Sequence, residues 1–146
     1  MSQNSSEFSH ICFSVQNIKK SRTFYVEALG FTATEYYKFD EAPNKLMEID
    51  GNVAFDTQFL ILGSTRLELM CIREPPQVPP VRRAPMFHCG FTHIAIRVPD
   101  LETTLAKVRT HAGTVLDNTR TRLPMDGYEC DMAYCTDPDG NRIELL

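Results

Sequence analysis

The sequence predicts an α+β protein made of two tandem βαβββ modules, whose strands form a concave, half-open, barrel-like mixed sheet with the helices outside. The first observation behind this prediction is a repeat: residues 10–18 match residues 93–101, and Gly30 matches Gly113 at the same separation of 83 residues. The second is that both copies contain segments of alternating apolar and polar residues, typical of strands, around one segment with helical spacing. We therefore expect the same order of elements twice.

The last ten residues, 137–146, show the repeat most clearly. They begin with Asp-Pro-Asp-Gly, which favours a turn, and continue with alternating residues, which favours a half-buried strand. Residues 65–70 match residues 141–146 position for position, including the glutamates Glu68 and Glu144. A strand so near a chain terminus is usually kept only when it is central to its sheet, so we expect an interior strand here.

The first copy is predicted to begin with a strand at residues 9–15 and a helix at residues 19–29. Asn17 is a suitable residue to cap the start of this helix, and Gly30 to end it. In the strand, apolar residues form one face and small polar residues the other, which is consistent with a cavity wall. The remaining elements are strands at residues 32–39, 53–62 and 65–72, with a loop at residues 40–51.

A proline-rich segment separates the two copies. Residues 74–85 contain five of the nine prolines, which predicts an extended linker rather than a helix or a central strand. The second copy then repeats the first, with Asp100 capping its helix and Gly113 ending it. Its expected elements are strands at residues 91–98, 114–120 and 129–136, a helix at residues 100–112, a polar loop at residues 121–128 and the closing strand. We thus expect one domain, residues 1–146, with module one at about 8–72, the linker at about 73–90 and module two at about 91–146.

Composition limits the classes of function. A chain of 146 residues with 42% hydrophobic residues is long enough to bury a core as one domain, and a net charge of −4 gives no electrostatic case for nucleic acid or an anionic membrane. The N-terminal residues lack an apolar signal segment, and no run approaches the length of a membrane span, so we predict a cytoplasmic protein. Five cysteines without a Cys-x-x-Cys pair favour reduced thiols.

Four side chains stand out as candidate metal ligands. In each copy one histidine opens the first strand and one glutamate lies in the last strand, always on the face opposite to the residues that the helix must cover. Two modules related by pseudo-twofold symmetry would bring these groups around one centre. Imidazole and carboxylate form a ligand set suited to a first-row divalent ion, with open positions for water and substrate. The set is His10, Glu68, His93 and Glu144, whereas His88 and His111 have no partner in the repeat.

The chain resembles the vicinal oxygen chelate superfamily, which includes glyoxalase I, methylmalonyl-CoA epimerase, type I extradiol dioxygenases, fosfomycin-modifying enzymes and bleomycin-resistance proteins. The resemblance covers about residues 8–146. It is carried by the His-Ile openings at His10 and His93, by the Phe-Tyr-x-x-x-Leu-Gly-Phe helix end at residues 24–31, by Leu-Glu-Leu at residues 67–69, and by the segment at residues 137–145.

The resemblance implies a metal site formed by the same four residues and a base at Glu144, assisted by Glu68. One divalent ion per site, Zn, Ni, Co, Mn or Fe, would bind a small substrate through two vicinal oxygens and act as a Lewis acid. We therefore expect a glyoxalase-like lyase, isomerase or epimerase that transfers a proton next to a carbonyl. We also expect a homodimer, in which the site lies within one chain or between modules of two chains.

Several features keep other functions open. Epimerases of the superfamily have a second acid on the strand before the first glutamate, where this chain offers Gln58 or Phe59, and the facing of Asp56 is undecided. Glyoxalase I usually has an arginine ahead of the helix aromatics, where this chain has Lys19, Lys20 and Arg22. The alternatives are an iron-dependent extradiol-type dioxygenase, which normally lacks a fourth ligand, and a metal-free binding or resistance protein. The strand residues Cys12, Ser14, Met70 and Ala95 predict a moderately apolar pocket, and Arg122 is a candidate to hold an anionic group.

Overall fold

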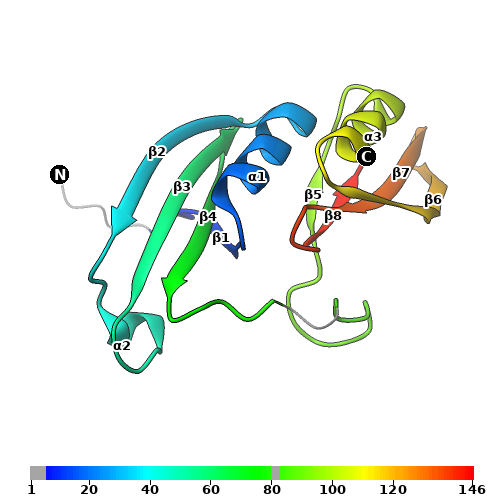
Figure 1. Cartoon of the computed structure of the whole chain (residues 1–146). Coiled ribbons are helices and arrows are strands. Elements are labelled where there is room, and N and C mark those ends of the chain that lie inside the picture. The colour runs from blue at the N-terminus through cyan, green and yellow to red at the C-terminus, as the bar shows by residue number, and fades with distance from the viewer. Residues whose placement is uncertain (1–5, 80–82) are drawn as a thin grey trace.

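A computed structural model describes residues 6–79 and 83–146, and residues 80–82 of the predicted linker lie outside this range. The strands form two separate four-stranded mixed sheets, neither of which closes into a barrel (Figure 1). The first has the order β1-β4-β3-β2 and the second β5-β8-β7-β6, so the same topology occurs twice. The predicted α+β class and repeated module are confirmed. The strands are β1 Ile11–Ser14, β2 Thr32–Phe39, β3 Ala54–Leu62, β4 Thr65–Glu74, β5 Ile94–Ile96, β6 Thr114–Met125, β7 Tyr128–Thr136 and β8 Arg142–Leu145.

The pairing explains why the last strand is retained so close to the terminus. Strand β8 lies between β5, which it pairs with in parallel, and β7, which it pairs with antiparallel. Strand β4 occupies the same place in the first sheet, between β1 and β3. Both glutamate-bearing strands are therefore interior, as expected, whereas β1 and β5 are the edges that follow the two histidines.

The first helix begins as predicted but changes geometry halfway. Helix α1, Ile18–Thr23, starts where the Asn17 side chain accepts a hydrogen bond from the backbone N–H of Lys20 at 3.0 Å. It continues as a π-helical turn, η1, Phe24–Ala28, and the chain leaves it at Gly30 with φ of +78°. The turn contains two consecutive aromatic residues, Phe24 and Tyr25, and both are fully buried. The wider turn thus places two adjacent rings in the core.

Three expected elements differ in the structure. The loop expected at residues 40–51 contains the short helix α2, Asn44–Met47. The first strand of module two is limited to β5. The loop expected at residues 121–128 is a continuation of β6 and β7, which meet at a tight turn with Gly127 at φ of +85°. Polar side chains in this hairpin pair across the two strands, as Arg122 and Asp131 do in an ion pair.

Gly113 is needed for a reason other than the one predicted from sequence. The second helix is α3, Leu101–Thr110, and the residue with positive φ after it is Ala112 at +65°. A Cβ atom at Gly113 would lie 2.4 Å from the Phe24 ring and 2.8 Å from the carbonyl oxygen of Thr136. Gly113 therefore permits close packing of the second module against the first helix.

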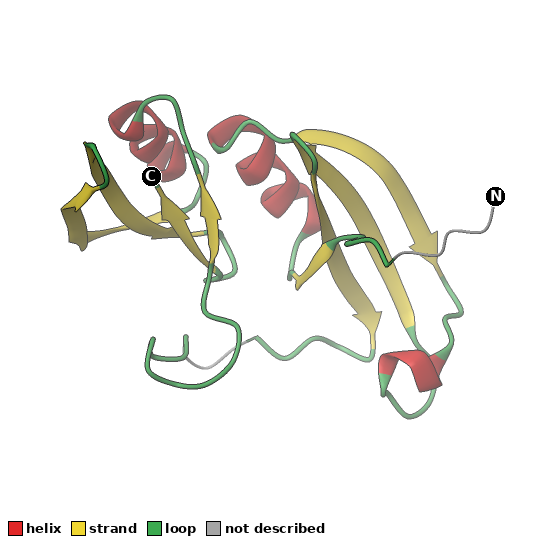
Figure 2. Ribbon diagram, turned by 180° about the vertical axis from the view of Figure 1, so that it is seen from behind, coloured by secondary structure: helices red, strands yellow, loops and turns green. Residues whose placement is uncertain are grey.

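The two helices lie side by side, each against the sheet of its own module (Figure 2), and α3 contacts η1. The helix-covered faces of both sheets contribute to one continuous core. Polar contacts from the Asp-Pro-Asp-Gly turn join the modules: Asp139 accepts hydrogen bonds from the backbone N–H of Gln16 and from the Ser21 hydroxyl, at 2.9 and 2.8 Å. The Tyr25 hydroxyl donates to Asp137 at 3.0 Å in the interior. The turn therefore helps to fix how the modules pack.

Replacing Tyr25 with phenylalanine is expected to lower the free energy of unfolding by about 1 to 3 kcal/mol at pH 7, because Asp137 loses one of its donors while buried. Burial raises the pKa of Asp137 above its ordinary value of 3.8, and the bonds from Asn141 and Tyr25 oppose this shift. A raised pKa means that this carboxyl contributes stability that is complete below pH 3.8 and is lost as the pH rises through its folded pKa. The variant raises that pKa further, so its deficit is expected to shrink toward pH 4.

Urea unfolding at pH 7 and pH 4 checks this expectation, with Tyr128→Phe as the control because Tyr128 is 51% exposed. An equal deficit at both pH values would contradict a role for the ionised Asp137.

Candidate metal centre

The first predicted pair of ligands lies together on module one. His10 directly precedes β1, and Glu68 lies in β4, its parallel neighbour. The His10 Nε2 atom is 3.0 Å from the Glu68 Oε2 atom, and the side chains are 34% and 14% exposed. On the opposite side of β4, Leu67 and Leu69 are buried in the core. Strand alternation therefore places the pair on the face that the helix does not cover.

Neighbouring side chains hold this first pair in place. The Ser9 hydroxyl lies 2.9 Å from the Nδ1 atom of His10, which leaves Nε2 directed at Glu68. The Thr57 hydroxyl donates to Glu68 Oε1 at 2.6 Å. The Phe59 ring meets the His10 ring edge to face at 5.6 Å. Partners of this kind orient metal-binding histidines and carboxylates in proteins.

Module two repeats this arrangement. The His93 Nε2 atom is 3.5 Å from the Glu144 Oε2 atom, and the side chains are 24% and 19% exposed. The Thr92 hydroxyl lies 3.0 Å from the His93 Nδ1 atom, as Ser9 does for the first histidine. The Tyr134 ring packs on His93 at 5.3 Å, in the position that Phe59 has in module one. Burial, followed by the charge of Glu144, raises the pKa of Tyr134, so the phenol stays protonated and able to donate.

Two arginines that match in the repeat have different roles. Arg142 is buried and donates to the carbonyl oxygens of Thr92 at 3.2 Å and Ala84 at 3.1 Å, which ties the linker and the residue before His93 to β8. Arg66 instead lies over the Phe59 ring at 3.9 Å and 3.4 Å from a Glu35 oxygen. Arg142 thus helps to position the second histidine, whereas Arg66 remains partly exposed beside the first pair.

The structure brings the four predicted residues together as two pairs and not as one group. Within residues 6–79 and 83–146, no cluster of three or more histidine, cysteine, aspartate or glutamate side chains has the geometry to hold a metal ion. The two pairs belong to separate sheets, one in each module (Figure 2). Each pair nevertheless presents one imidazole nitrogen and one carboxylate, and a neighbouring hydroxyl lies near the other imidazole nitrogen. That donor chemistry fits half of a four-ligand divalent metal site.

The structure also settles which strand residues face the first pair. Phe59 lies across from Glu68, whereas Asp56 has the opposite parity and binds Arg73 at 3.0 Å. The Gln58 amide donates to the backbone carbonyls of Thr34, Glu35 and Phe59, so it is not directed at the site. No second acid therefore stands beside Glu68 on strand β3.

The thiol of Cys12 also lies beside Glu68. Its partial burial, reinforced by the glutamate charge, raises the pKa of this thiol to about 12. Cys12 is therefore a neutral thiol at physiological pH, which suits a weakly polar wall beside the pair better than a reactive nucleophile.

The residues that the sequence analysis missed are those that support the ligands. One signal was available: a hydroxyl residue precedes each histidine, Ser9 before His10 and Thr92 before His93. Thr57 and Tyr134 had no such signal because their roles depend on the register of β3 with β4 and of β7 with β8.

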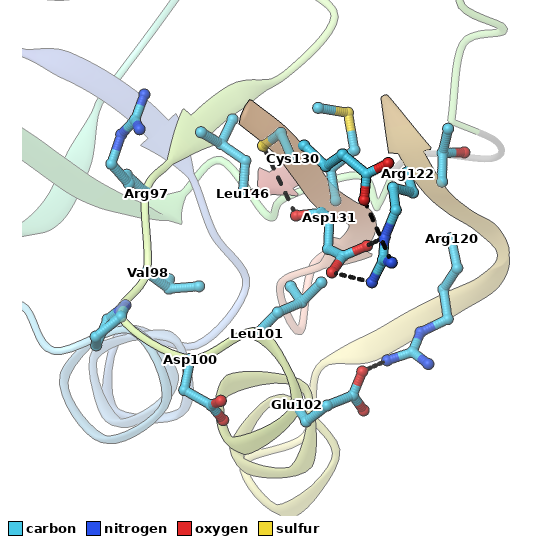
Figure 3. Close-up of a pocket in the computed structure, with 14 residues that line it drawn as sticks. Arg97, Val98, Asp100, Leu101, Glu102, Arg120, Arg122, Cys130, Asp131 and Leu146 are labelled. Atoms are coloured by element: carbon cyan, nitrogen blue, oxygen red, sulfur yellow. Dashed lines mark hydrogen bonds and ion pairs between the residues drawn. The ribbon is translucent and has the colours of Figure 1, made fainter. Parts of the chain in front are cut away.

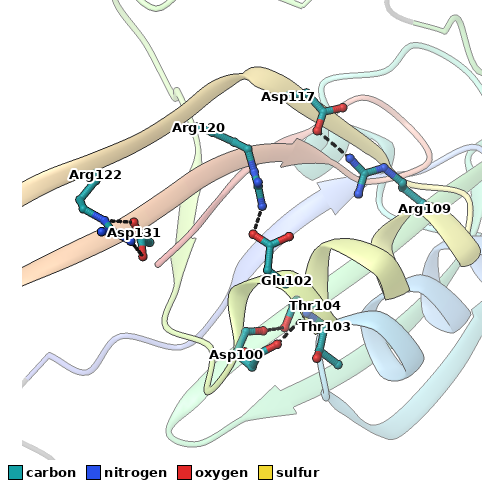
Figure 4. A network of polar contacts seen from close by, with 9 residues as sticks. All are labelled: Asp100, Glu102, Thr103, Thr104, Arg109, Asp117, Arg120, Arg122 and Asp131. Carbon is teal, nitrogen blue, oxygen red and sulfur yellow. Dashed lines mark hydrogen bonds and ion pairs between the residues drawn. The ribbon is translucent and has the colours of Figure 1, made fainter.

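A pocket of about 680 Å³ lies beside the second module, between the start of α3 and the β6–β7 hairpin (Figure 3). Arg122, the predicted anion-binding residue, lines it, but its Nε and Nη2 atoms already donate to Asp131 at 2.6 and 2.8 Å. Arg120 forms an ion pair with Glu102 through one nitrogen, Nη2 (Figure 4). An anion would have to displace these carboxylates, so the structure offers no preformed anion site at Arg122.

The fold and the site define a duplicated βαβββ protein with one His–Glu pair per module, and comparisons with known proteins agree with this fold. Residues 7–145 match the model of the Glyoxalase/Bleomycin resistance protein/Dioxygenase superfamily. The chain therefore belongs to that superfamily. The helices of the described residues include none that is long and apolar enough to span a membrane.

Three relatives illustrate the similarity. The uncharacterised protein YaeR of Escherichia coli K12 is 30% identical over 138 residues, which cover 93% of this chain and 92% of that protein. A Synechocystis protein named "Probable lactoylglutathione lyase" is 40% identical over 57 residues, which cover 39% of this chain and 41% of that protein. The crystal structure of a glyoxalase family protein from Bacillus cereus superposes with a TM-score of 0.81 at 17% identity, covering 99% of this chain and 96% of that one.

Proposed function

We propose that this protein is a divalent-metal-dependent, glyoxalase-like lyase, isomerase or epimerase that transfers a proton next to a substrate carbonyl. The observation that carries the proposal is the repeated pair, His10 with Glu68 and His93 with Glu144, each on the uncovered face of its sheet. The similarity to a protein named as a lactoylglutathione lyase supports the same class of reaction.

The four side chains have defined roles in this proposal. The Nε2 atoms of His10 and His93 and the carboxylates of Glu68 and Glu144 would hold the ion, which when bound supplies a Lewis acid for two vicinal substrate oxygens. Ser9 and Thr92 keep the two imidazole rings oriented through their Nδ1 atoms.

Glu144 is proposed as the base that takes the proton from the substrate carbon. The two glutamates are not equivalent, because the hydroxyl of Thr57 holds one oxygen of Glu68 at 2.6 Å. Near Glu144 stands the protonated phenol of Tyr134, which is suited to donate a hydrogen bond to a carboxylate or a substrate oxygen. Glu68 is therefore the better fixed ligand, and Glu144 is the better candidate to exchange protons.

We further propose that a complete site forms between two chains. In one chain the pairs lie on separate sheets, and each histidine precedes an edge strand, β1 or β5, whose outer side has no partner strand among the described residues. An apolar cavity of about 440 Å³ beside these edges, lined by Ile11, Leu67 and Phe91 among others, extends to His93. Phe91 is 67% exposed there, which is costly unless another surface covers it. A symmetric dimer that joins module one of each chain to module two of its partner would cover these edges.

Mixing two inactive variants tests this arrangement. One carries His10→Ala and Glu68→Ala, and the other carries His93→Ala and Glu144→Ala. If each site combines pairs from two chains, co-refolded mixtures are expected to regain metal in about a quarter of the sites, because half of the dimers are mixed and each has one intact site. Elemental analysis and exchange of solvent deuterium into S-lactoylglutathione, used as the first probe substrate, report the recovery.

Each variant refolded alone is the control and is expected to stay metal-poor. A mixture that recovers neither metal nor exchange, while the wild type refolds with both, would contradict a site shared between chains.

A further inference from the structure

The uncovered face of module one carries a group of aromatic side chains next to the first His–Glu pair. Phe59 contacts His10 at 5.6 Å, Tyr37 contacts Phe59 at 6.3 Å, and Phe39 contacts Tyr37 at the same distance. Phe39 and Phe55 stack at 4.7 Å. We call these four residues, Tyr37, Phe39, Phe55 and Phe59, the aromatic patch. The patch is continuous with the proposed metal site.

Strand register places the patch on a line that leads away from the pair. Phe59 lies across from Glu68, and Tyr37 lies across from Thr57, two residues earlier on β3. Phe39 and Phe55 pair two residues further on. Since two residues of a strand span about 7 Å, the patch extends from the pair to about 13 Å from it.

The patch is open at Tyr37 and Phe39, and a charged group that contacts it is Arg66, which lies over the Phe59 ring near the first His–Glu pair. Tyr37 is 47% exposed and Phe39 is 38% exposed, in strand β2, where almost every residue is exposed. The charged residues next to them, Lys38 and Asp56, pair with each other in register on the other side of the sheet. Exposed aromatic groups that adjoin a site in this way are typical of surfaces that bind a ligand.

Module two lacks an equivalent surface. The positions that correspond to Tyr37 and Phe39 are Thr121 and Leu123, which pair with Met132 and Cys130. Only the residue next to the histidine, Tyr134, remains aromatic. Because the rest of the site is repeated, the aromatic patch is not required by the fold or by the metal ligands. Its presence in one module alone indicates a role in recognising an asymmetric substrate.

We infer that the substrate carries a planar aromatic or conjugated group about 7 to 13 Å from the oxygens that reach the His–Glu pairs, and that Tyr37 and Phe39 bind this group. The inference rests on the proposed function, since it takes the reacting end of the substrate to lie at the pairs. Rings prefer edge-to-face or offset contact with other rings, which gives an aromatic group an advantage over a saturated ring of similar size.

Two hydroxamates that differ only in their terminal ring test the inference. Phenylbutanohydroxamate and cyclohexylbutanohydroxamate both present two vicinal oxygens, so they differ only at the patch. By calorimetry, the metal-loaded wild type is expected to bind the phenyl compound roughly 3 to 10 times more tightly than the cyclohexyl compound. In Tyr37→Leu/Phe39→Leu this preference is expected to disappear.

Tyr36→Leu is the matched control. Tyr36 is 50% exposed and adjacent in sequence, but it pairs with Gln58 and lies on the other face of the sheet. Its preference is expected to equal that of the wild type. Equal affinity of the wild type for both compounds, or an undiminished preference in the double variant, would overturn the inference.

Two further measurements separate this inference from the proposed function. Acetohydroxamate has no ring, so its failure to bind the metal-loaded protein would count against the metal chemistry alone. The ring preference is also read without metal, by saturation-transfer NMR with phenylbutanol and cyclohexylbutanol. The alternative is that a second copy of the chain, and not a substrate, covers the aromatic patch, and sedimentation of the double variant tests it. A double variant that loses the dimer but keeps the ring preference would overturn the inference. A double variant with an unchanged dimer supports it.

Discussion

Replacing His93 with alanine is expected to remove most of the bound divalent metal, with affinity reduced by at least about 100-fold. The imidazole contributes one of four proposed ligand atoms, and its loss also frees Glu144, whose carboxylate lies 3.5 Å from His93 Nε2. His10→Ala is expected to behave in the same way, because the first pair has the same geometry at 3.0 Å. Elemental analysis after dialysis, followed by metal titration, gives the stoichiometry and the affinity.

His88→Ala is the control for this experiment, since His88 is exposed and contacts Phe87 away from both pairs. Its metal content is expected to match the wild type. Undiminished metal in His93→Ala, or equal losses in His93→Ala and His88→Ala, would rule out the proposed ligand set.

Replacing Glu144 with glutamine is expected to slow proton transfer about 100-fold or more while much of the metal is retained. An amide oxygen still coordinates a metal, but it does not take a proton at physiological pH, so the variant separates the ligand role from the base role. Glu68→Gln is expected to have a smaller effect on the proton-transfer step, since the Thr57 hydroxyl still holds its oxygen. NMR measures the exchange of solvent deuterium into the substrate carbon of S-lactoylglutathione.

Metal content must be measured on the same samples. Exchange at the wild-type rate in metal-loaded Glu144→Gln would show that the base is another group. A larger loss of exchange rate in Glu68→Gln than in Glu144→Gln would show that Glu68, and not Glu144, is the base.

The repeat, the order of most elements and the four candidate ligands were predictable from the sequence alone. Strand alternation has a period of two, so the buried Leu67 and Leu69 determine that Glu68 faces the other way. The repeat gives the same result for Glu144, which lies between the buried Ile143 and Leu145. The starts of the helices were predictable for a similar local reason, since the Asn17 and Asp100 side chains accept hydrogen bonds from backbone N–H groups three residues later.

Only the tertiary structure decided how these residues combine. Whether Thr57 reaches Glu68, or Tyr134 reaches His93, depends on the register of β3 against β4 and of β7 against β8. The role of Gly113 depends on a ring from the other module, and the aromatic patch depends on Tyr37 and Phe39 pairing with β3. The separation of the ligands into two pairs depends on how the two sheets and their helices pack together. The physical reason is that local sequence sets the periodicity and the caps, whereas long-range packing sets which faces meet.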